Sequence, residues 1–144
     1  MAGITGRSER DAIKSRLSSL VNGHVYKTAV PDSKALTRDS AGRVLPYIVL
    51  RYSTPKMSTV GRNIASGEQG QPHMITFTLI VESGDADWTE DVMDNATTKL
   101  VGWQPSETSG VIQARGGFDY DDSDTSSKPT RFGSTMFGRF YINV

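Results

Sequence analysis

The feature that most constrains the fold is a run of strict alternation between residues 73 and 82. Large apolar residues occupy every second position of this run: Ile75, Phe77, Leu79 and Val81. The residues between them are Met74, Thr76, Thr78 and Ile80. Such alternation predicts a β-strand from His73 to Glu82 with one face in a hydrophobic core. The apolar face then needs a second layer to cover it.

A second run, Pro46–Tyr52, is the expected partner of this strand. Its two faces carry Ile48, Leu50 and Tyr52 on one side, and Tyr47, Val49 and Arg51 on the other. Polar stretches flank both runs, so we expect them to pair as a hairpin. Because both faces of Pro46–Tyr52 carry apolar residues, neither face is expected to be freely solvated.

Residues Ser8–Val21 are predicted to form an amphipathic helix. Ser8 is the expected N-cap, and Asp11 follows three residues later as in a capping box. Asn22-Gly23 provides a left-handed stop after the helix. The apolar stripe of the helix consists of Ile13, Leu17, Leu20 and Val21.

A second amphipathic helix is predicted to begin at Asp85 or Asp87 and to end at Gly102. Acidic residues gather in its first turns, where the positive end of the helix dipole favours them. Its expected buried stripe consists of Trp88, Val92, Ala96 and Leu100.

Three further segments are predicted to be strands: His24–Val30, Val111–Tyr120 and Arg131–Val144. Five strands and two helices predict a two-layer α+β fold. The sheet would be antiparallel-rich, with about five strands and with both helices packed on one face. At 144 residues, the chain is expected to form a single domain, 1–144. The expected inner faces of the last two strands consist of Ile112, Ala114, Gly116, Phe118 and Tyr120, and of Met136, Phe140, Ile142 and Val144.

The composition argues against several classes of protein. The chain has no cysteine, which removes disulfides, thiolate metal sites and cysteine nucleophiles. It has no apolar run of about 18 residues that would predict a transmembrane helix. The first residues also lack the apolar stretch of a secretory signal. We therefore expect no association with a membrane.

The motifs do not predict catalysis. No G-x-S-x-G element supports a hydrolase triad, and neither His24 nor His73 has a ligand partner at helical spacing. The run Asp119–Asp124 resembles the start of a calcium loop, but Asp124 and Thr130 stand where glycine and glutamate are needed. A solvated acidic loop over residues 121–130 is expected instead. We expect no catalytic, cofactor-binding or metal-binding residues.

The charges balance overall but are unevenly distributed. The chain has 16 Lys and Arg and 16 Asp and Glu. Residues 1–62 hold 11 of the basic residues and four acidic ones, whereas residues 63–144 hold five and 12. This division is compatible with a chance distribution over one surface, or with two oppositely charged faces that meet head to tail in a ring. Zero net charge argues against a general DNA binder.

Residues 53–71 form an unusually long connection between the two clearest strands. Loops longer than about 12–15 residues are uncommon in compact domains and are usually functional or disordered. The connection is either an extended loop or hairpin arm that reaches a neighbouring subunit, or a hairpin without that role. Its candidate contact residues are Lys56, Arg62, Asn63 and Glu68.

A second group of candidate contact residues lies on the sheet face opposite the predicted helices. These residues are large, and an exposed aromatic set on that face would indicate a contact surface. The group consists of Tyr47, Arg51, Arg139 and Tyr141.

In their order, these segments resemble the tail terminator (tail completion) proteins of long-tailed bacteriophages. The resemblance covers nearly the whole chain. It rests on the first helix SERDAIKSRLSSLVNGHVY, the strands PYIVLRYS and ITFTLIVES, the acidic-capped helix DWTEDVMDNATTKLVGW and the closing strand MFGRFYINV.

The resemblance implies a hexameric ring that caps the tail tube, stops its elongation and presents the head-joining surface. The implied partners are further copies of the chain, the tail tube protein and the head-closure or neck protein. DNA would pass through the ring without sequence-specific binding. The implied location is the neck region of the virion, after assembly in the host cytoplasm, and no cofactor is implied.

Other classes remain open. A head-closure or neck connector, or a tail tube protein, would share a small α+β or β-rich fold, although the two helices disfavour a tube subunit. A small ligand-binding or enzymatic α+β domain would need a concave pocket with convergent ionisable groups.

Overall fold

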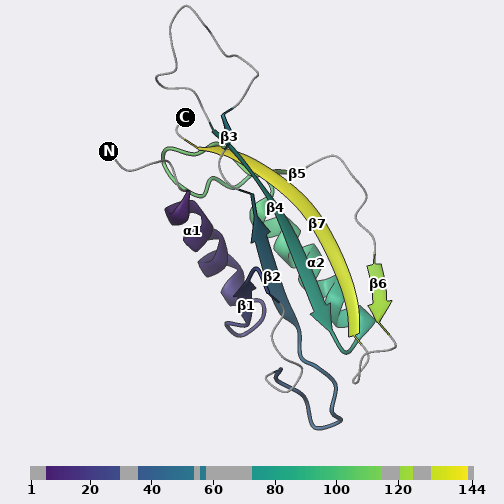
Figure 1. The fold of residues 1–144 in the computed structure, drawn as a ribbon. Helices are drawn as coiled ribbons and strands as arrows, with labels where there is room; N and C mark the ends of the chain where they lie inside the picture. Colours follow the sequence, from purple (N-terminus) through teal and green to yellow (C-terminus); the bar gives the residue numbers. More distant parts are fainter. Residues whose placement is uncertain are drawn as a thin grey trace, which may run out of the picture.

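A computed structural model of the chain describes residues 6–29, 36–53, 56–57, 73–114, 121–124 and 131–142. Neither helix in these ranges is long and apolar enough to cross a membrane. Figure 1 shows the elements, which in chain order are α1 (Arg7–Ser18), β1 (Val25–Lys27), β2 (Tyr47–Tyr52), β3 (Lys56–Met57), β4 (His73–Ser83), α2 (Ala86–Leu100), β5 (Gln113–Ala114), β6 (Asp121–Asp124) and β7 (Arg131–Ile142).

The described strands form one sheet in the order β1-β2-β4-β7-β5, with β3 beside β4 and β6 beside β7. Its centre is the antiparallel pairing of β4 with β7, which uses the whole length of β4. The antiparallel pairing of β2 with β4 is as predicted. Only the short edge strand β1 runs parallel to its neighbour. The predicted antiparallel-rich α+β architecture is therefore confirmed.

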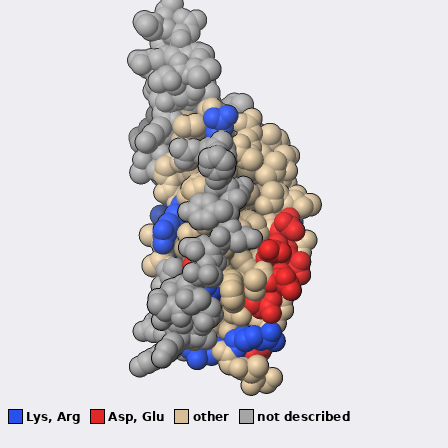
Figure 2. Space-filling view, turned by 90° about the vertical axis from the view of Figure 1, so that its right-hand side faces the viewer, with Lys and Arg blue, Asp and Glu red and all other residues tan. Residues whose placement is uncertain are grey.

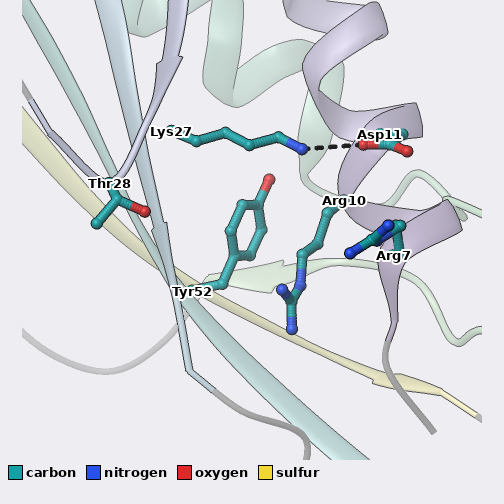
Figure 3. A pocket seen from close by; sticks show the side chains of 6 residues that line it. All are labelled: Arg7, Arg10, Asp11, Lys27, Thr28 and Tyr52. Carbon is teal, nitrogen blue, oxygen red and sulfur yellow. Dashed lines mark hydrogen bonds and ion pairs between the residues drawn. The ribbon is translucent and has the colours of Figure 1, made fainter.

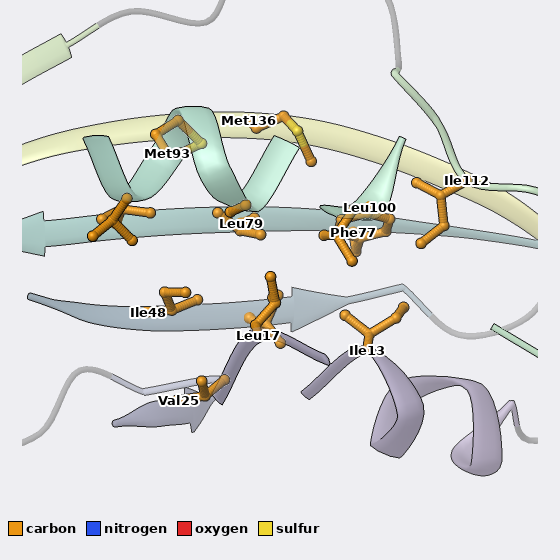
Figure 4. Close-up of a cluster of buried hydrophobic side chains, with 14 of the residues drawn as sticks. Ile13, Leu17, Val25, Ile48, Phe77, Leu79, Met93, Leu100, Ile112 and Met136 are labelled. Atoms are coloured by element: carbon orange, nitrogen blue, oxygen red, sulfur yellow. The ribbon is translucent and has the colours of Figure 1, made fainter. Parts of the chain in front are cut away.

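Both helices pack on one face of this sheet and close a hydrophobic core (Figure 4). The predicted inner residues of Pro46–Tyr52 and His73–Glu82 all contribute to it. The buried residues of the core are Ile13, Leu17, Val21, Val25, Ile48, Leu50, Ile75, Phe77, Leu79, Val81, Val92, Met93, Ala96, Leu100, Ile112, Met136, Phe140 and Ile142.

One position in this core depends on the absence of a side chain. Gly138 lies opposite Phe77 in the β4–β7 register. A Cβ at Gly138 would overlap the Phe77 ring. The ring therefore packs over the glycine, and the two strands form a close-packed layer there.

The N-cap prediction holds for α2 and fails for α1. Asp85 caps α2, because its Oδ1 accepts hydrogen bonds from two backbone N–H groups of the first turn, at 2.9 and 3.2 Å. The cap position of α1 is Gly6, with a φ of 65° and no side-chain cap. Ser8 lies inside α1 and donates its hydroxyl hydrogen to Glu9 Oε2 at 2.9 Å instead. The predicted cap at Ser8 is therefore wrong.

The helix α1 ends at Ser18, three residues before the predicted end at Val21, and the strand that follows is also shorter than predicted. Asn22 and Gly23 adopt left-handed φ values of 50° and 83°. The strand β1 then ends at Lys27, because Thr28 has a φ of 70° and the Ala29 N–H donates to the Lys27 carbonyl at 2.7 Å. A γ-turn with a β-branched residue at positive φ is strained. This turn replaces the predicted strand at residues 28–29, and Val30 lies outside the described residues.

The region after α2 differs most from the sequence prediction. Of the predicted strand Val111–Tyr120, the described part forms only β5, and Ala114 is exposed rather than inward. Asp121–Asp124 forms β6 instead of part of an acidic loop. From Ala114 to Asp121 the chain advances by seven residues, while its partners on β7 shift by only four. A strand paired without interruption would advance by the same number of residues as its partner, so β5 and β6 are not one continuous strand along β7. Residues 115–120 and 125–130 lie outside the described ranges.

The long connection between β2 and β4 is shorter than predicted, because β3 pairs with β4 and so extends the hairpin. From Tyr52 to Lys56 the chain advances by four residues. Their partners on β4, Phe77 and Met74, are only three residues apart. Ser53, the last described residue before this change of register, still faces Thr76: its N–H donates to the Thr76 carbonyl at 2.8 Å, and its Oγ accepts a hydrogen bond from the Thr76 N–H at 3.0 Å. The connection that remains, 58–72, lies outside the described ranges.

Candidate assembly surface

The sheet face away from the helices, here called the open face, carries several of the predicted contact residues. Arg51, Arg139 and Tyr141 lie on it because they alternate with core residues of β2 and β7. Arg51 is exposed, and the other two are half-buried. Lys56 lies in register with Met74, which pairs with Tyr141. The structure therefore brings Arg51, Arg139 and Tyr141 together on one face, with the backbone of Lys56 in register beside them.

Hydrogen bonds orient the two arginines of the open face. Arg51 Nε donates to the Thr28 carbonyl at 3.0 Å. Arg139 Nε donates to Gln113 Oε1 at 3.2 Å. Each guanidinium thus donates one of its five N–H groups to a residue at a neighbouring edge of the sheet. The remaining N–H groups give the open face directed donors for a partner.

Tyr47 is on the open face but is not exposed, so the expectation of an exposed tyrosine there is wrong. Residues 36–45 fold back over this end of the face. Leu36 and Val44 pack there with Tyr47 and Val49 in a second, smaller cluster. Tyr47 is only 1% exposed. The alternation placed Tyr47 on the correct face, but no local pattern showed that residues 36–45 would cover it.

The Tyr47 hydroxyl is part of a partly buried hydrogen-bond chain. It donates to Glu82 Oε2, and Arg131 Nη1 donates to the Tyr47 oxygen at 3.4 Å. Burial, together with the neighbouring Glu82 carboxylate, raises the pKa of Tyr47 well above its ordinary value. The hydroxyl therefore stays protonated and acts as a structural donor.

Ion pairs of Arg43 connect residues 36–45 to the start of α2. Its Nε lies 3.0 Å from Asp39 Oδ2, and its Nη1 lies 3.1 Å from Asp85 Oδ2. Its guanidinium carbon also lies 4.4 Å from the centroid of the Trp88 ring. Burial by itself would raise the pKa of the Asp39 carboxyl. The hydrogen bonds and the positive charge of Arg43 outweigh this effect and lower the pKa of Asp39. Trp88, predicted for the buried stripe of α2, is instead half-buried beside Arg43.

A basic pocket of about 450 Å³ lies between α1 and the β1 edge of the sheet (Figure 3). Lys27 Nζ is 3.1 Å from Asp11 Oδ1 within it. The guanidinium carbon of Arg10 lies 5.4 Å from the centroid of the Tyr52 ring. The described lining carries three cations and one carboxylate, which make this part of the surface electropositive. Its lining consists of Arg7, Arg10, Asp11, Lys27, Thr28 and Tyr52.

Sequence reasoning missed this basic pocket. The available signal was the spacing of Arg7 and Arg10, which puts both on neighbouring positions of one helix face. Lys27 and Tyr52 come from two different strands. Only the parallel pairing of β1 with β2 brings those strands together beside α1.

The outward side of α2 is acidic. Four of its exposed residues have side chains that repeat at helical spacing and so lie along one face. Figure 2 shows acidic side chains gathered in one patch of the surface. We call the α2 residues the acidic stripe, which consists of Asp87, Glu90, Asp91 and Asp94. Part of the charge asymmetry of the sequence therefore corresponds to two separate surfaces.

The other candidate residues of the arm, Arg62, Asn63 and Glu68, lie outside the described residues. Within the described ranges, no three His, Asp or Glu side chains come together as metal ligands would. His24 Nε2 lies 3.3 Å from the Thr37 hydroxyl oxygen, and His73 begins β4. The described surface thus offers charges and hydrogen-bond donors arranged over faces and edges of the sheet.

No protein-family model and no curated protein matches this sequence. Among solved structures, nine chains match. One of them belongs to the virion of a native gene transfer agent particle. The two chains share 15% sequence identity and superpose with a TM-score of 0.63, over 98% of each chain. The fold of this chain is thus similar, along nearly its whole length, to that of a chain from a virion.

Proposed function

We propose that this chain is a structural protein of a phage-like virion, and specifically a tail terminator. In this role it forms a hexameric ring on the end of the tail tube, stops tube elongation and provides the head-joining surface. The observation that carries the proposal is the shared fold over 98% of both chains with a chain of a virion. The order of the helices and strands, which resembles tail terminators, supports the finer assignment.

The described surface supports a role in assembly. The open face presents directed donors from Arg51 and Arg139, and Tyr141 adds a half-buried aromatic ring. Aromatic residues and arginine are enriched where protein interfaces are strongest. We propose that these residues and Lys56, together with Arg62, Asn63 and Glu68 of the arm, contact a neighbouring subunit or the tube. The work of the protein is then interfacial and not enzymatic.

The proposed partners follow from the role. They are further copies of the chain, the tail tube protein on one side of the ring and the head-closure or neck protein on the other. DNA passes through the ring without sequence-specific binding, in keeping with the zero net charge of the chain. The proposed location is the neck region of the virion.

Native mass spectrometry and negative-stain imaging of the purified protein test the ring. We expect six copies in a ring with a central opening. The tube protein of the same particle, assembled with and without this chain, then tests the role. A terminator shortens the tubes and occupies one end. Long tubes made of this chain would identify a tube subunit, and rings that leave tube length unchanged would favour a head-closure protein. A monomer in the presence of the tube protein would refute the proposal.

The arm can be tested separately, because the register shows where to close the hairpin. Met57 and His73 are paired, so a two-residue turn can join them. We expect a variant with Asn-Gly in place of residues 58–72 to fold, since Asn-Gly suits a two-residue hairpin turn. Its thermal unfolding should match that of the wild type, whereas ring formation or tube docking should be impaired. A variant that still assembles and terminates tubes would show that the arm has no such role.

A further inference from the structure

Two polar atoms in the basic pocket lack hydrogen-bond partners within the described part of the chain. They are Tyr52 Oη and Arg10 Nε, and both are buried. Buried polar groups in proteins are nearly always paired. Both atoms can donate a hydrogen bond, and their residues line a pocket of about 450 Å³. The pocket lining therefore carries two donors without a partner in the described part of the single chain, and a side-chain rotation is needed to turn them toward an acceptor from outside.

The charges of the pocket favour a carboxylate as that acceptor. Among the described residues that line the pocket, Arg7, Arg10 and Lys27 are basic and Asp11 is acidic. The Lys27–Asp11 pair has side chains that are 49% and 57% exposed, and such surface pairs are weak enough to be rearranged. Burial raises the pKa of Tyr52, so its hydroxyl keeps its proton and can donate. Hydrogen bonds from guanidinium and hydroxyl groups to a carboxylate are among the strongest in proteins.

The chain itself carries a matching set of carboxylates. The acidic stripe lies on the exposed side of α2, and α2 has no Lys or Arg before Lys99. From Asp87 to Asp94 the stripe extends over about 10 Å of helix. A second copy can therefore present several carboxylates to the pocket at once.

We propose that the acidic stripe of one copy docks into the basic pocket of the next. This inference rests on the proposed function, because it names the contact that would build the ring. The pocket lies between α1 and β1, whereas the stripe lies on the outer side of α2. Two different surfaces of each copy are used, so the contact is head to tail and repeats until the ring closes.

A charge swap tests this contact in the full-length protein. Arg10→Glu reverses a pocket charge, and Asp91→Arg reverses a charge of the stripe. We expect each single variant to weaken association about tenfold or more, and the double variant to recover most of this loss. Lys14→Glu on α1 and Glu107→Arg after α2 are the matched controls, since they make the same charge changes outside both surfaces. Analytical ultracentrifugation measures association, and circular dichroism checks folding.

Tyr52→Phe provides a second test that does not depend on charge. The hydroxyl has no partner in the described part of the single chain. Its removal should therefore leave the unfolding temperature of a dissociated subunit unchanged or slightly higher, while ring association weakens. A purely structural hydroxyl would give the opposite result, with a less stable subunit and unchanged association.

The outcomes separate this contact from the ring itself. Weakening by both single variants with recovery in the double variant supports the contact. Weakening without recovery, or association unchanged by either variant, overturns the contact and leaves the proposed ring in place. A wild-type protein that stays monomeric overturns both.

Discussion

The two faces of the central sheet differ in how completely they are covered. Two helices seal one face, and every inward residue of β4 from Ile75 to Val81 is buried there. On the open face, residues 36–45 cover only the end around Tyr47 and Val49. The rest of that face, with Arg51, has no such cover in the described structure. One sheet thus combines a face sealed by helices with a face on which the described structure leaves Arg51 exposed.

This difference lets the same few strands provide both a core and a surface. The core needs only one side of each strand, because side chains alternate between the faces. The other side is then under fewer packing constraints. Substitutions on the closed face should therefore cost more stability than matched substitutions on the open face.

Phe77→Ala should cause the largest loss of stability. Its ring is buried in the core between the helices and Gly138, so its removal should cost about 4 kcal/mol of unfolding free energy. Phe137→Ala is the matched control on the open face, and should cost about 1 kcal/mol. Urea unfolding monitored by circular dichroism measures both. Equal losses would mean that the two faces are packed to the same extent.

Gly138→Ala should destabilise the closed face by about 2 kcal/mol. The new Cβ would overlap the Phe77 ring, which is held on all sides by the core. Gly133→Ala on the same strand is the control, because a Cβ there lies 3.5 Å from Glu82 Cγ, an ordinary contact. We expect the control to change stability by less than about 0.5 kcal/mol. A tolerated Gly138→Ala would show that the core around Phe77 can rearrange.

Tyr47→Phe tests the covered end of the open face. Loss of the hydroxyl should cost about 1 kcal/mol at neutral pH. The raised pKa of Tyr47 means that the folded state holds the proton more tightly than the unfolded state. Its stabilising effect is therefore complete below about pH 10 and is lost as the pH rises further.

The unfolding free energy of the wild type should accordingly fall as the pH rises above about 10, to be measured by urea unfolding at each pH. Tyr47→Phe should remove part of this fall. Tyr52, whose pKa is also raised by burial, should account for a further part. An identical fall in the wild type and in Tyr47→Phe would contradict the structural role of this hydroxyl.

Arg139→Ala should have the smallest effect on stability, within about 0.5 kcal/mol, because the hydrogen bond of its side chain within the described residues is to the exposed Gln113. Its effect should appear in assembly, as weaker association of rings or of rings with tubes. Sedimentation at several protein concentrations measures this change. Unchanged assembly would remove Arg139 from the proposed contact surface.

The parts of the fold that could be predicted are those encoded by local patterns. The alternation from Ile75 to Val81 predicted the buried face of β4, because period-two spacing directly determines which residues face the core. Asp85 was among the two predicted starts of α2, since a cap acts only on the N–H groups of the next turn. Four of the candidate contact positions also lie on the predicted face for this reason.

The remaining features depend on contacts between distant segments. The fold-back of residues 36–45 over Tyr47 relies on Arg43 reaching Asp85. The break between β5 and β6 depends on a change of register along β7. The basic pocket forms because Lys27 and Tyr52 lie beside α1. No residue spacing in the sequence predicts this contact.

The pairing of β4 with β7 also has a consequence for the order of events during synthesis. The paired residues lie between 49 positions apart, at Ser83 and Phe132, and 69 positions apart, at His73 and Ile142. Contacts between such distant residues form slowly, because a long loop must close first. While the chain is being synthesised, β4 therefore cannot pair with β7 until β7 has left the ribosome. Arg139 and Tyr141 lie on β7, so the open face is complete only in a subunit whose core has already closed, and incomplete chains cannot present it to a partner.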